Sequence, residues 1–239
     1  MTCERVSREI GSLRRLAARY ALVPRAHGQL VAILETLAAD DRAPTSVRDP
    51  REAIDVHLAD SLAALEIDRM RSARWIADIG AGAGFPGLPL AAALPGSEVR
   101  LIESQAKKCQ FLRRVIAAGG LDNARVVEGR VEEWREGLGA HDVAVVRALA
   151  PAAVVLEYAA PLLARDGILI DWRGRGDAAQ EEAALAAAAQ LGLKLVEVRG
   201  VRPYEGARDH HLHVYEKVRE TPDRFPRRAG MARKRPLGS

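Results

Sequence analysis

From residue 75 onward, short apolar runs alternate with segments whose apolar residues recur every three or four positions. Short apolar runs favour buried strands, and spacings of three and four favour amphipathic helices. The last predicted strand alternates apolar and polar residues, so we expect it to run antiparallel to the strand before it. This pattern predicts strands at 75–79, 98–103, 124–128, 142–146, 167–171, 194–198 and 211–218, helices at 87–93, 107–118, 152–163 and 178–191, and a short helical piece at 131–135. Such alternation indicates an α/β fold, a doubly wound, mostly parallel, seven-stranded sheet with helices on both faces.

The first 70 residues show helical spacing without strands. We expect helices at about 7–22, 29–39 and 51–65, with Pro24 ending the first of them and a polar loop at 40–49. The chain then divides into three parts. These are an N-terminal helical prefix at 1–70 that packs on the main domain, a main domain at 71–218, and a C-terminal tail at 219–239.

The stretch WIADIGAGAGFPGLPL at 75–90 is typical of a strand, a tight glycine turn and a helix start. Gly80, Gly82 and Gly84 stand at every second position, which lets a ligand approach bare backbone beside a helix N-terminus. The dinucleotide fingerprint G-x-G-x-x-G does not fit, because its third glycine would fall at Phe85. The pattern D-x-G-x-G-x-G instead resembles motif I of the Rossmann-like class I methyltransferases, which use S-adenosylmethionine. We therefore expect that cofactor over the turn.

An acidic residue at the end of the second predicted strand supports this interpretation. Glu103 follows the glycine turn at roughly the distance, about 20 residues, at which a carboxylate accepts hydrogen bonds from ribose hydroxyls. A structural glycine turn with an unrelated surface glutamate is the alternative. Ligands of such sheets bind at the carboxyl ends of the strands, so Gly80, Glu103, residues 128–132 and Arg147 are expected at one edge.

Composition narrows the class of protein. The chain of 239 residues is 48% hydrophobic, which allows a sizeable core, and no apolar run reaches transmembrane length. The two cysteines, Cys3 and Cys109, lie far apart and outside metal-ligand spacing, which suits a reducing compartment. Cys109 is expected to be a small core residue. We expect a cytoplasmic protein without a secretion signal or a membrane span.

The net charge of +4 is concentrated in the tail. Residues 219–239 hold seven arginine and lysine residues against two acids, so the tail carries +5 and the rest of the chain −1. Arginine-rich segments favour phosphate contacts with nucleic acid, but they also occur as disordered, solvated ends. Both interpretations of the tail stay open at this point.

Several longer motifs occur in a fixed order along the chain. They are HLADSL at 57–62, DIGAGAGFPGLPL at 78–90, IESQAKKCQFLRRV at 102–115, GRVEEW at 129–134 and VVRALAP at 145–151. In these motifs the chain resembles the ribosomal RNA small-subunit methyltransferase G family, also called glucose-inhibited division protein B. The resemblance covers nearly the whole length, and the F-P-G that follows the glycine turn is its most specific element.

The resemblance implies that S-adenosylmethionine donates a methyl group to N7 of the guanine at position 527 of 16S ribosomal RNA, in the 530-loop region. Carried over to this chain, it implies that Gly80, Gly82, Gly84 and Phe85 line the cofactor. Val131 and Glu132 would border the adenine, and Arg147 would face the methionine end or the target. The tail resembles that of longer family members.

The residues that follow the fourth predicted strand bear on the chemistry. Enzymes that methylate exocyclic amines resemble one another in an Asp or Asn followed by Pro-Pro and an aromatic residue, whereas this chain has VRAL at 146–149. A cysteine nucleophile for pyrimidine carbon is also missing from strand ends. The lone pair of guanine N7 is already a nucleophile, so we expect direct transfer by positioning, with no general base and no metal.

The histidines can be interpreted as structural or as functional residues. His210, His211 and His213 could suggest zinc, but no third ligand has suitable spacing beside the alternating pair, so we expect none. His57 and Asp60, three residues apart on a helix, could form an acid–base pair. A local cap, or a packing hydrogen bond between prefix and sheet, is the favoured interpretation.

The expected partner is 16S ribosomal RNA or the assembling small ribosomal subunit, contacted by a monomer that needs neither membrane nor metal. Two other functions stay open. One is a class I methyltransferase that acts on another RNA, a small molecule or a protein. The other is an RNA- or ribosome-associated binding protein whose cofactor pocket is only a sensor.

Overall fold

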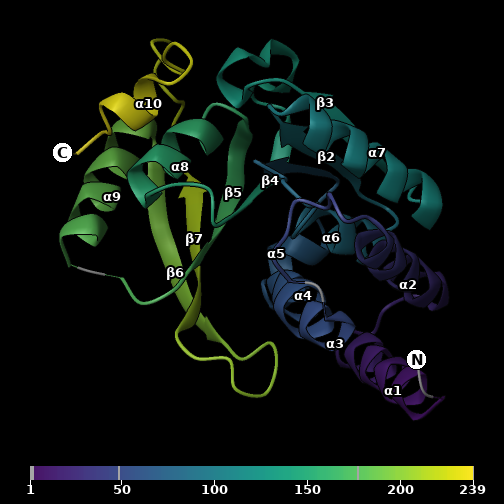
Figure 1. Cartoon of the computed structure of the whole chain (residues 1–239). Coiled ribbons are helices and arrows are strands. Elements are labelled where there is room, and N and C mark those ends of the chain that lie inside the picture. The colour runs from purple at the N-terminus through teal and green to yellow at the C-terminus, as the bar shows by residue number, and fades with distance from the viewer. Residues whose placement is uncertain (1–2, 48, 177, 239) are drawn as a thin grey trace.

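The computed structural model describes residues 3–47, 49–176 and 178–238, and a seven-stranded sheet forms its centre (Figure 1). The sheet has the order β3-β2-β1-β4-β5-β7-β6. Its strands are β1 (Trp75–Ile79), β2 (Glu98–Glu103), β3 (Ala124–Glu128), β4 (His141–Arg147), β5 (Leu163–Arg173), β6 (Leu193–Val201) and β7 (His210–Lys217). The first five run parallel, and β7 lies antiparallel between β5 and β6. The predicted fold class and the predicted direction of the last strand are confirmed.

Alternate residues of the central strands point to opposite faces of the sheet, and each face has its own core. In β4, Val143 and Val145 join the core of one face, whereas Ala144 and Val146 join the core of the other. The first core includes α6 (Gly87–Ala93), α7 (Ala106–Gly119) and the helical prefix, and the second includes α8 (Ala152–Ala159) and α9 (Ala178–Leu191) (Figure 1). The continuous apolar run of β4 is therefore explained by burial on both faces.

The three predicted helices of the prefix begin earlier than expected, and the third is divided into several short segments. It comprises α1 (Cys3–Arg19), α2 (Pro24–Ala39), α3 (Pro50–Ala53), the π-helical turn η1 (Ile54–Ala59), α4 (Asp60–Leu62), the 3-10 turn η2 (Ala63–Glu66) and α5 (Asp68–Arg71). The prediction for Pro24 was wrong: this residue begins α2, where a missing N–H costs no hydrogen bond. The turn before it is made by Ala21, whose φ is 51°. α2 packs on α6 and α7 and so covers one side of the main domain.

Several boundaries beyond the prefix also differ from the prediction. The helix predicted at 152–163 ends at Ala159, because Pro161 lacks an N–H and cannot continue it. Leu163 instead begins β5, pairing with His141 before an irregularity in the register. β6 continues to Val201, and the helical piece predicted at 131–135 forms two 3-10 turns, η3 (Val131–Glu133) and η4 (Arg135–Gly137). β5 also ends at Arg173, two residues later than predicted, and the other boundaries in the main domain agree within one residue.

The tail at 219–238 folds onto the α8 and α9 side of the sheet and contains the short helix α10 (Met231–Lys234) (Figure 1). Phe225 and Ala232 are buried in the same core as α8. This packing excludes the disordered interpretation of the tail for these residues. Within 3–47, 49–176 and 178–238, no helix combines the length and apolar character needed to cross a bilayer.

Candidate active site

The glycine turn joins β1 to α6 through backbone conformations that side chains disfavour. Gly80, Gly82 and Gly84 have φ angles of 75°, 57° and 95°. The N–H groups of Gly80 and Ala81 donate to the carbonyl of Ile102 in β2, at 2.9 and 3.0 Å. The turn is thus fixed against the end of the neighbouring strand, and its glycines are required by the left-handed backbone.

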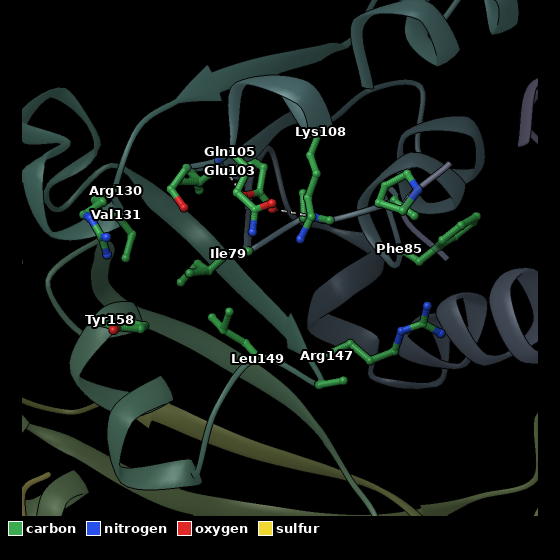
Figure 2. Close-up of a pocket in the computed structure, with 18 of the residues that line it drawn as sticks. Ile79, Phe85, Glu103, Gln105, Lys108, Arg130, Val131, Arg147, Leu149 and Tyr158 are labelled. Atoms are coloured by element: carbon green, nitrogen blue, oxygen red, sulfur yellow. Dashed lines mark hydrogen bonds between the residues drawn. The ribbon is translucent and has the colours of Figure 1, made fainter. Parts of the chain in front are cut away.

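A cavity of about 460 Å³ opens beside this turn at the carboxyl ends of β1, β2, β3 and β4. Seven predicted site residues line it: Gly80, Gly82, Phe85, Glu103, Val131, Glu132 and Arg147. Figure 2 shows Val131 and Tyr158 at one end of the cavity and Phe85 and Arg147 at the other. The strand order reverses between β1 and β4, which is where open α/β sheets bind their ligands.

Glu103 connects the glycine turn to the end of β2. Its two carboxylate oxygens accept hydrogen bonds from the N–H of Gly82, at 3.1 Å, and of Gln105, at 2.8 Å. Only 6% of the residue is exposed, yet it lines the cavity. Each oxygen keeps a further lone pair, so the carboxylate can accept hydroxyl donors from a ligand while it holds the turn in place.

Gly84 is the predicted cofactor residue that the structure places elsewhere. It lies outside the cavity lining, and a Cβ at this position would clash with the side chain of Leu88 and come within 3.0 Å of Leu112. By contrast, a Cβ at Gly82 would have no protein atom closer than 3.7 Å. Gly84 therefore serves close packing of turn against helix, and Gly82 leaves space in the cavity.

This difference predicts opposite phenotypes for two alanine variants. Gly82→Ala is expected to cost about 1 kcal/mol of unfolding free energy, from the left-handed backbone, and to weaken S-adenosylmethionine binding at least about tenfold. Gly84→Ala is expected to lose about 3 kcal/mol, because overpacking adds to the backbone cost. Urea denaturation and calorimetric titration separate the two effects. Equal stability losses in both variants would contradict the assignment.

Asp78, the acid of the D-x-G-x-G-x-G pattern, is a buried structural residue. It is 1% exposed, and its Oδ2 accepts the N–H of Gly87 at 2.9 Å, which fixes the first turn of α6. Burial raises the pKa of Asp78 to about 7, although the Gly87 hydrogen bond acts in the opposite direction. The carboxyl group therefore titrates near neutral pH.

The raised pKa of Asp78 makes stability depend on pH. Between pH 3.8 and about 7 the unfolded chain loses this proton while the folded chain keeps it, so the contribution of Asp78 to stability falls as pH rises. Asn at this position carries no such proton. From pH 4 to pH 8, the stability of Asp78→Asn is expected to gain on the wild type by up to about 4 kcal/mol, measured by urea denaturation. Asp122→Asn, at an exposed position, is the control and should show no such change.

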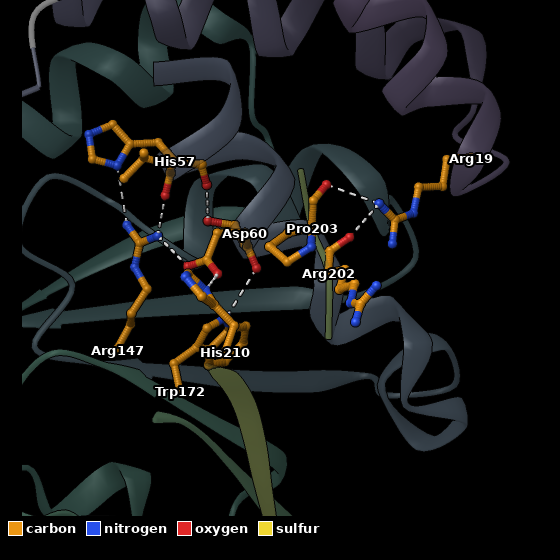
Figure 3. A network of polar contacts seen from close by, with 10 residues as sticks. Arg19, His57, Asp60, Arg147, Trp172, Arg202, Pro203 and His210 are labelled. Carbon is orange, nitrogen blue, oxygen red and sulfur yellow. Dashed lines mark hydrogen bonds and ion pairs between the residues drawn. The ribbon is translucent and has the colours of Figure 1, made fainter. Parts of the chain in front are cut away.

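Arg147 is the last residue of β4, and its guanidinium is directed at the helical prefix (Figure 3). Nη1 donates to the carbonyl of Val56 at 2.8 Å and to Oδ2 of Asp60 at 2.9 Å. Nη2 lies 3.4 Å from Nδ1 of His57. The side chain is 16% exposed and also lines the cavity, so it joins the prefix to the cavity.

His57 and Phe85 form a stacked pair at the same end of the cavity. Their ring centroids are 4.3 Å apart with an interplanar angle of 9°, and the Arg147 guanidinium lies 5.7 Å from the Phe85 ring centroid. His57 Nε2 lies 2.9 Å from Oγ1 of Thr45. Burial and the nearby Arg147 charge lower the pKa of His57 to about 4. The imidazole of His57 is therefore neutral at physiological pH. Phe85, its stacking partner, lines the cavity.

Asp60 contacts the ends of three adjacent strands. Its carboxylate binds Arg147 of β4 and, at 3.0 Å, His210 Nδ1 of β7, while its carbonyl accepts Trp172 Nε1 of β5 at 3.0 Å. These contacts confirm the favoured interpretation of a hydrogen bond between prefix and sheet. His57 and Asp60 meet through Arg147.

The remaining predicted residues lie away from the cavity. His211 and His213 are on β7, and among residues 3–47, 49–176 and 178–238 no group of three or more His, Cys, Asp or Glu could hold a metal ion. Cys109 is buried in α7, which confirms its prediction as a core residue. The side chain of Cys3 lies outside the described part of the structure.

The structure also brings residues to the cavity that the sequence did not single out. Gln105 and Lys108 follow Glu103 at the start of α7, so their nearness to the acid was an available signal. Thr45, Tyr158 and Arg233 come from the prefix loop, α8 and the tail. No local pattern distinguishes these three, because only the tertiary fold places them here.

Comparison with known proteins shows the family of the chain. Residues 26–209 match the profile of the family described as rRNA small subunit methyltransferase G. The chain belongs to this family. The ribosomal RNA small subunit methyltransferase G of Synechococcus elongatus is 38% identical over 200 residues, which cover 81% of this chain and 82% of that protein. The protein of the same name from Syntrophomonas wolfei is 40% identical over 186 residues, which cover 77% of this chain and 86% of that protein.

Solved structures share the fold. Aeropyrum pernix fibrillarin, crystallised with natively bound S-adenosyl-L-methionine, superposes with a TM-score of 0.53 at 16% identity, covering 66% of this chain and 72% of its own. A putative sarcosine dimethylglycine methyltransferase from Galdieria sulphuraria gives a TM-score of 0.54 at 14% identity. The match covers 71% of this chain and 88% of that structure. At these identities the comparison shows a common architecture. The resemblance found in the sequence motifs is confirmed at the level of the family and the fold.

Proposed function

We propose that the protein transfers the methyl group of S-adenosylmethionine to N7 of the guanine at position 527 of 16S ribosomal RNA. Membership of the methyltransferase G family makes it an S-adenosylmethionine-dependent methyltransferase of small-subunit ribosomal RNA. The observation that carries the cofactor site is the Gly80–Gly82 turn, whose bare backbone faces the cavity beside the Glu103 carboxylate. The choice of nucleotide and ring atom rests on the family resemblance.

The cavity residues fit an adenosine at one end and a methionine at the other. The open space at Gly82 admits a ligand against the backbone, and Glu103 offers carboxylate lone pairs for the ribose hydroxyls. Val131 and Glu132 would border the adenine, and Phe85 with Arg147 would bound the reactive end. When bound, S-adenosylmethionine supplies an electrophilic methyl group on a sulfonium.

The residues at the reactive end support catalysis by positioning. His57 is held neutral by its low pKa, and Arg147 is engaged with Val56 and Asp60. Guanine N7 has an in-plane lone pair and loses no proton before attack, so the reaction needs no general base. Orientation of two bound reactants can account for about 7–11 kcal/mol of a reaction barrier. We therefore assign these residues the task of shaping and orienting.

The target edge restricts the form of the RNA. N7 faces the deep, narrow major groove of an A-form helix, which side chains cannot read. The substrate is accordingly an opened loop or an assembled, protein-bound RNA, and a free duplex should be a poor substrate. The monomeric state, the cytoplasmic location and the independence from metal stay predictions.

Transfer of tritium from labelled cofactor to 30S particles that lack the modification tests the proposal. Label is expected in 16S ribosomal RNA, and borohydride reduction followed by aniline should cleave the labelled RNA at position 527. Stripped 16S RNA and a synthetic duplex serve as comparison substrates. Label in a protein or a small molecule would support a different methyltransferase. Tight cofactor binding without any transfer would support a sensor.

A further inference from the structure

The basic tail is bound to the protein through a buried ion pair. Arg227 donates from Nε and Nη2 to the two carboxylate oxygens of Glu157 in α8, at 2.7 and 2.5 Å. Glu157 is 2% exposed, and Arg227 also donates to the carbonyl of Arg235 at 2.8 Å. A two-point guanidinium–carboxylate contact fixes both position and orientation. The tail therefore has a defined site on the surface of α8.

From this anchor the tail reaches two segments that line the cavity. The N–H of Gly230 donates to Oε1 of Glu132 at 2.8 Å, and Glu132 is buried. Nη2 of Arg233 donates to the carbonyl of Leu149 at 3.0 Å, in the loop after β4. The tail thus connects the segment after β3, the loop after β4 and α8.

Arg233 itself forms part of the cavity wall. It lies beside Tyr158, at the end that Figure 2 shows with Val131 and where the proposed adenine site is. Its side chain also contacts Tyr158, whose pKa is raised by burial. Arg233 and the next residue of α10, Lys234, are both exposed, but only Arg233 lines the cavity.

We propose that the tail completes the adenosine end of the cofactor cavity and that Arg233 is a positioning residue for the cofactor. This inference rests on the proposed S-adenosylmethionine site. A guanidinium held by Leu149 can stack on a flat aromatic ring or donate a hydrogen bond to a ring nitrogen, and an adenine offers both. Gly230 adds to this by fixing the side chain of Glu132. The positive charge of Arg233 thereby serves the donor rather than the RNA backbone.

Comparison of the two cofactor forms gives a specific expected result. S-adenosylmethionine and its product S-adenosylhomocysteine share the adenosine and differ at the sulfur. A residue at the adenosine end must therefore weaken both forms equally when it is removed. A residue that contacts RNA phosphates instead changes RNA affinity and its dependence on salt.

Calorimetric titration of the full chain tests the proposal. Arg233→Ala is expected to raise the dissociation constants of both cofactor forms about tenfold, and Arg233→Lys to restore part of the loss. The KM for 30S particles and its salt dependence should stay at wild-type values. Lys234→Ala removes the same charge from the same helix and should leave all these constants unchanged.

Loss of the anchor gives an independent readout. Glu157 lies outside the cavity lining, so Glu157→Gln is expected to weaken cofactor binding only through release of the tail. S-adenosylmethionine should also slow cleavage of the wild-type tail by trypsin, because linkage between two sites is reciprocal. This protection is a measurement that does not depend on methyl transfer.

The possible failures can be told apart. Wild-type protein that does not bind S-adenosylmethionine would overturn the proposed cofactor site. Wild-type binding with unchanged affinity in Arg233→Ala and no protection from trypsin would overturn only the role of the tail. A salt slope for RNA binding reduced by about 0.7 in Arg233→Ala, at constant cofactor affinity, would assign the residue to a phosphate contact instead.

Discussion

Replacing Arg147 by alanine is expected to lower the rate of methyl transfer at least about 100-fold, because small displacements of reacting groups cost this much. The guanidinium contacts three groups of the prefix and lies beside the Phe85 ring at the proposed reactive end. Its removal also leaves the buried Asp60 carboxylate without its main partner. The free energy of unfolding should therefore fall by about 3 kcal/mol, as for other broken buried pairs. Single-turnover kinetics and urea denaturation measure the two effects.

The control for this experiment is Arg147→Lys, which keeps the charge but cannot span the same acceptors with one ammonium group. It should recover part of the stability and less of the activity. Because the Arg147 charge helps to lower the pKa of His57, that pKa should rise in Arg147→Ala, as followed by NMR titration. Wild-type rates in the alanine variant, at a temperature at which it stays folded, would remove the orienting role of Arg147.

Replacing Glu103 by alanine is expected to weaken binding of S-adenosylmethionine about 100-fold. The loss corresponds to about 3 kcal/mol, the contribution expected from two hydroxyl groups that donate to one carboxylate. The variant also frees the N–H of Gly82, which loosens the turn that the ligand approaches. Calorimetric titration gives the dissociation constant directly, and S-adenosylhomocysteine should be affected to the same extent.

The matched control is Glu98→Ala, at the opposite end of the same strand. Glu98 lies 3.7 Å from Arg100 in a partly exposed pair and takes no part in the cavity. Its loss should leave cofactor binding unchanged. If Glu103→Ala bound the cofactor as tightly as Glu98→Ala does, the ribose would have to lie elsewhere.

Local sequence signals were sufficient for the half of the sheet that carries the proposed cofactor site. The bounds of β1, α6, β2 and β3 agree with the prediction, because glycines and charged residues stand at the places where each element ends. Two of the errors involve proline. Pro24 begins a helix instead of ending one, and Pro161 ends α8 early, since the effect of a proline depends on which helix end it meets.

Prediction of the site depended on spacing within one segment. The positions of Gly82 and Glu103 followed from the turn and from the length of one strand–helix–strand unit. The separate roles of Gly82 and Gly84 could not be predicted, because only the packing of Leu88 and Leu112 distinguishes them. The docking of the tail includes an ion pair across 70 residues of chain, Arg227 with Glu157, which no sequence pattern marks.

Asp60 gives the helical prefix a role in the integrity of the whole molecule. Through one residue the prefix satisfies polar groups on β4, β5 and β7, and through α2 it covers the apolar side of α6 and α7. A chain shortened to start at residue 71 would uncover all of these at once. Heating the intact protein should accordingly give a single melting transition, with prefix and sheet lost together, and the two parts should not be obtainable as separate folded fragments.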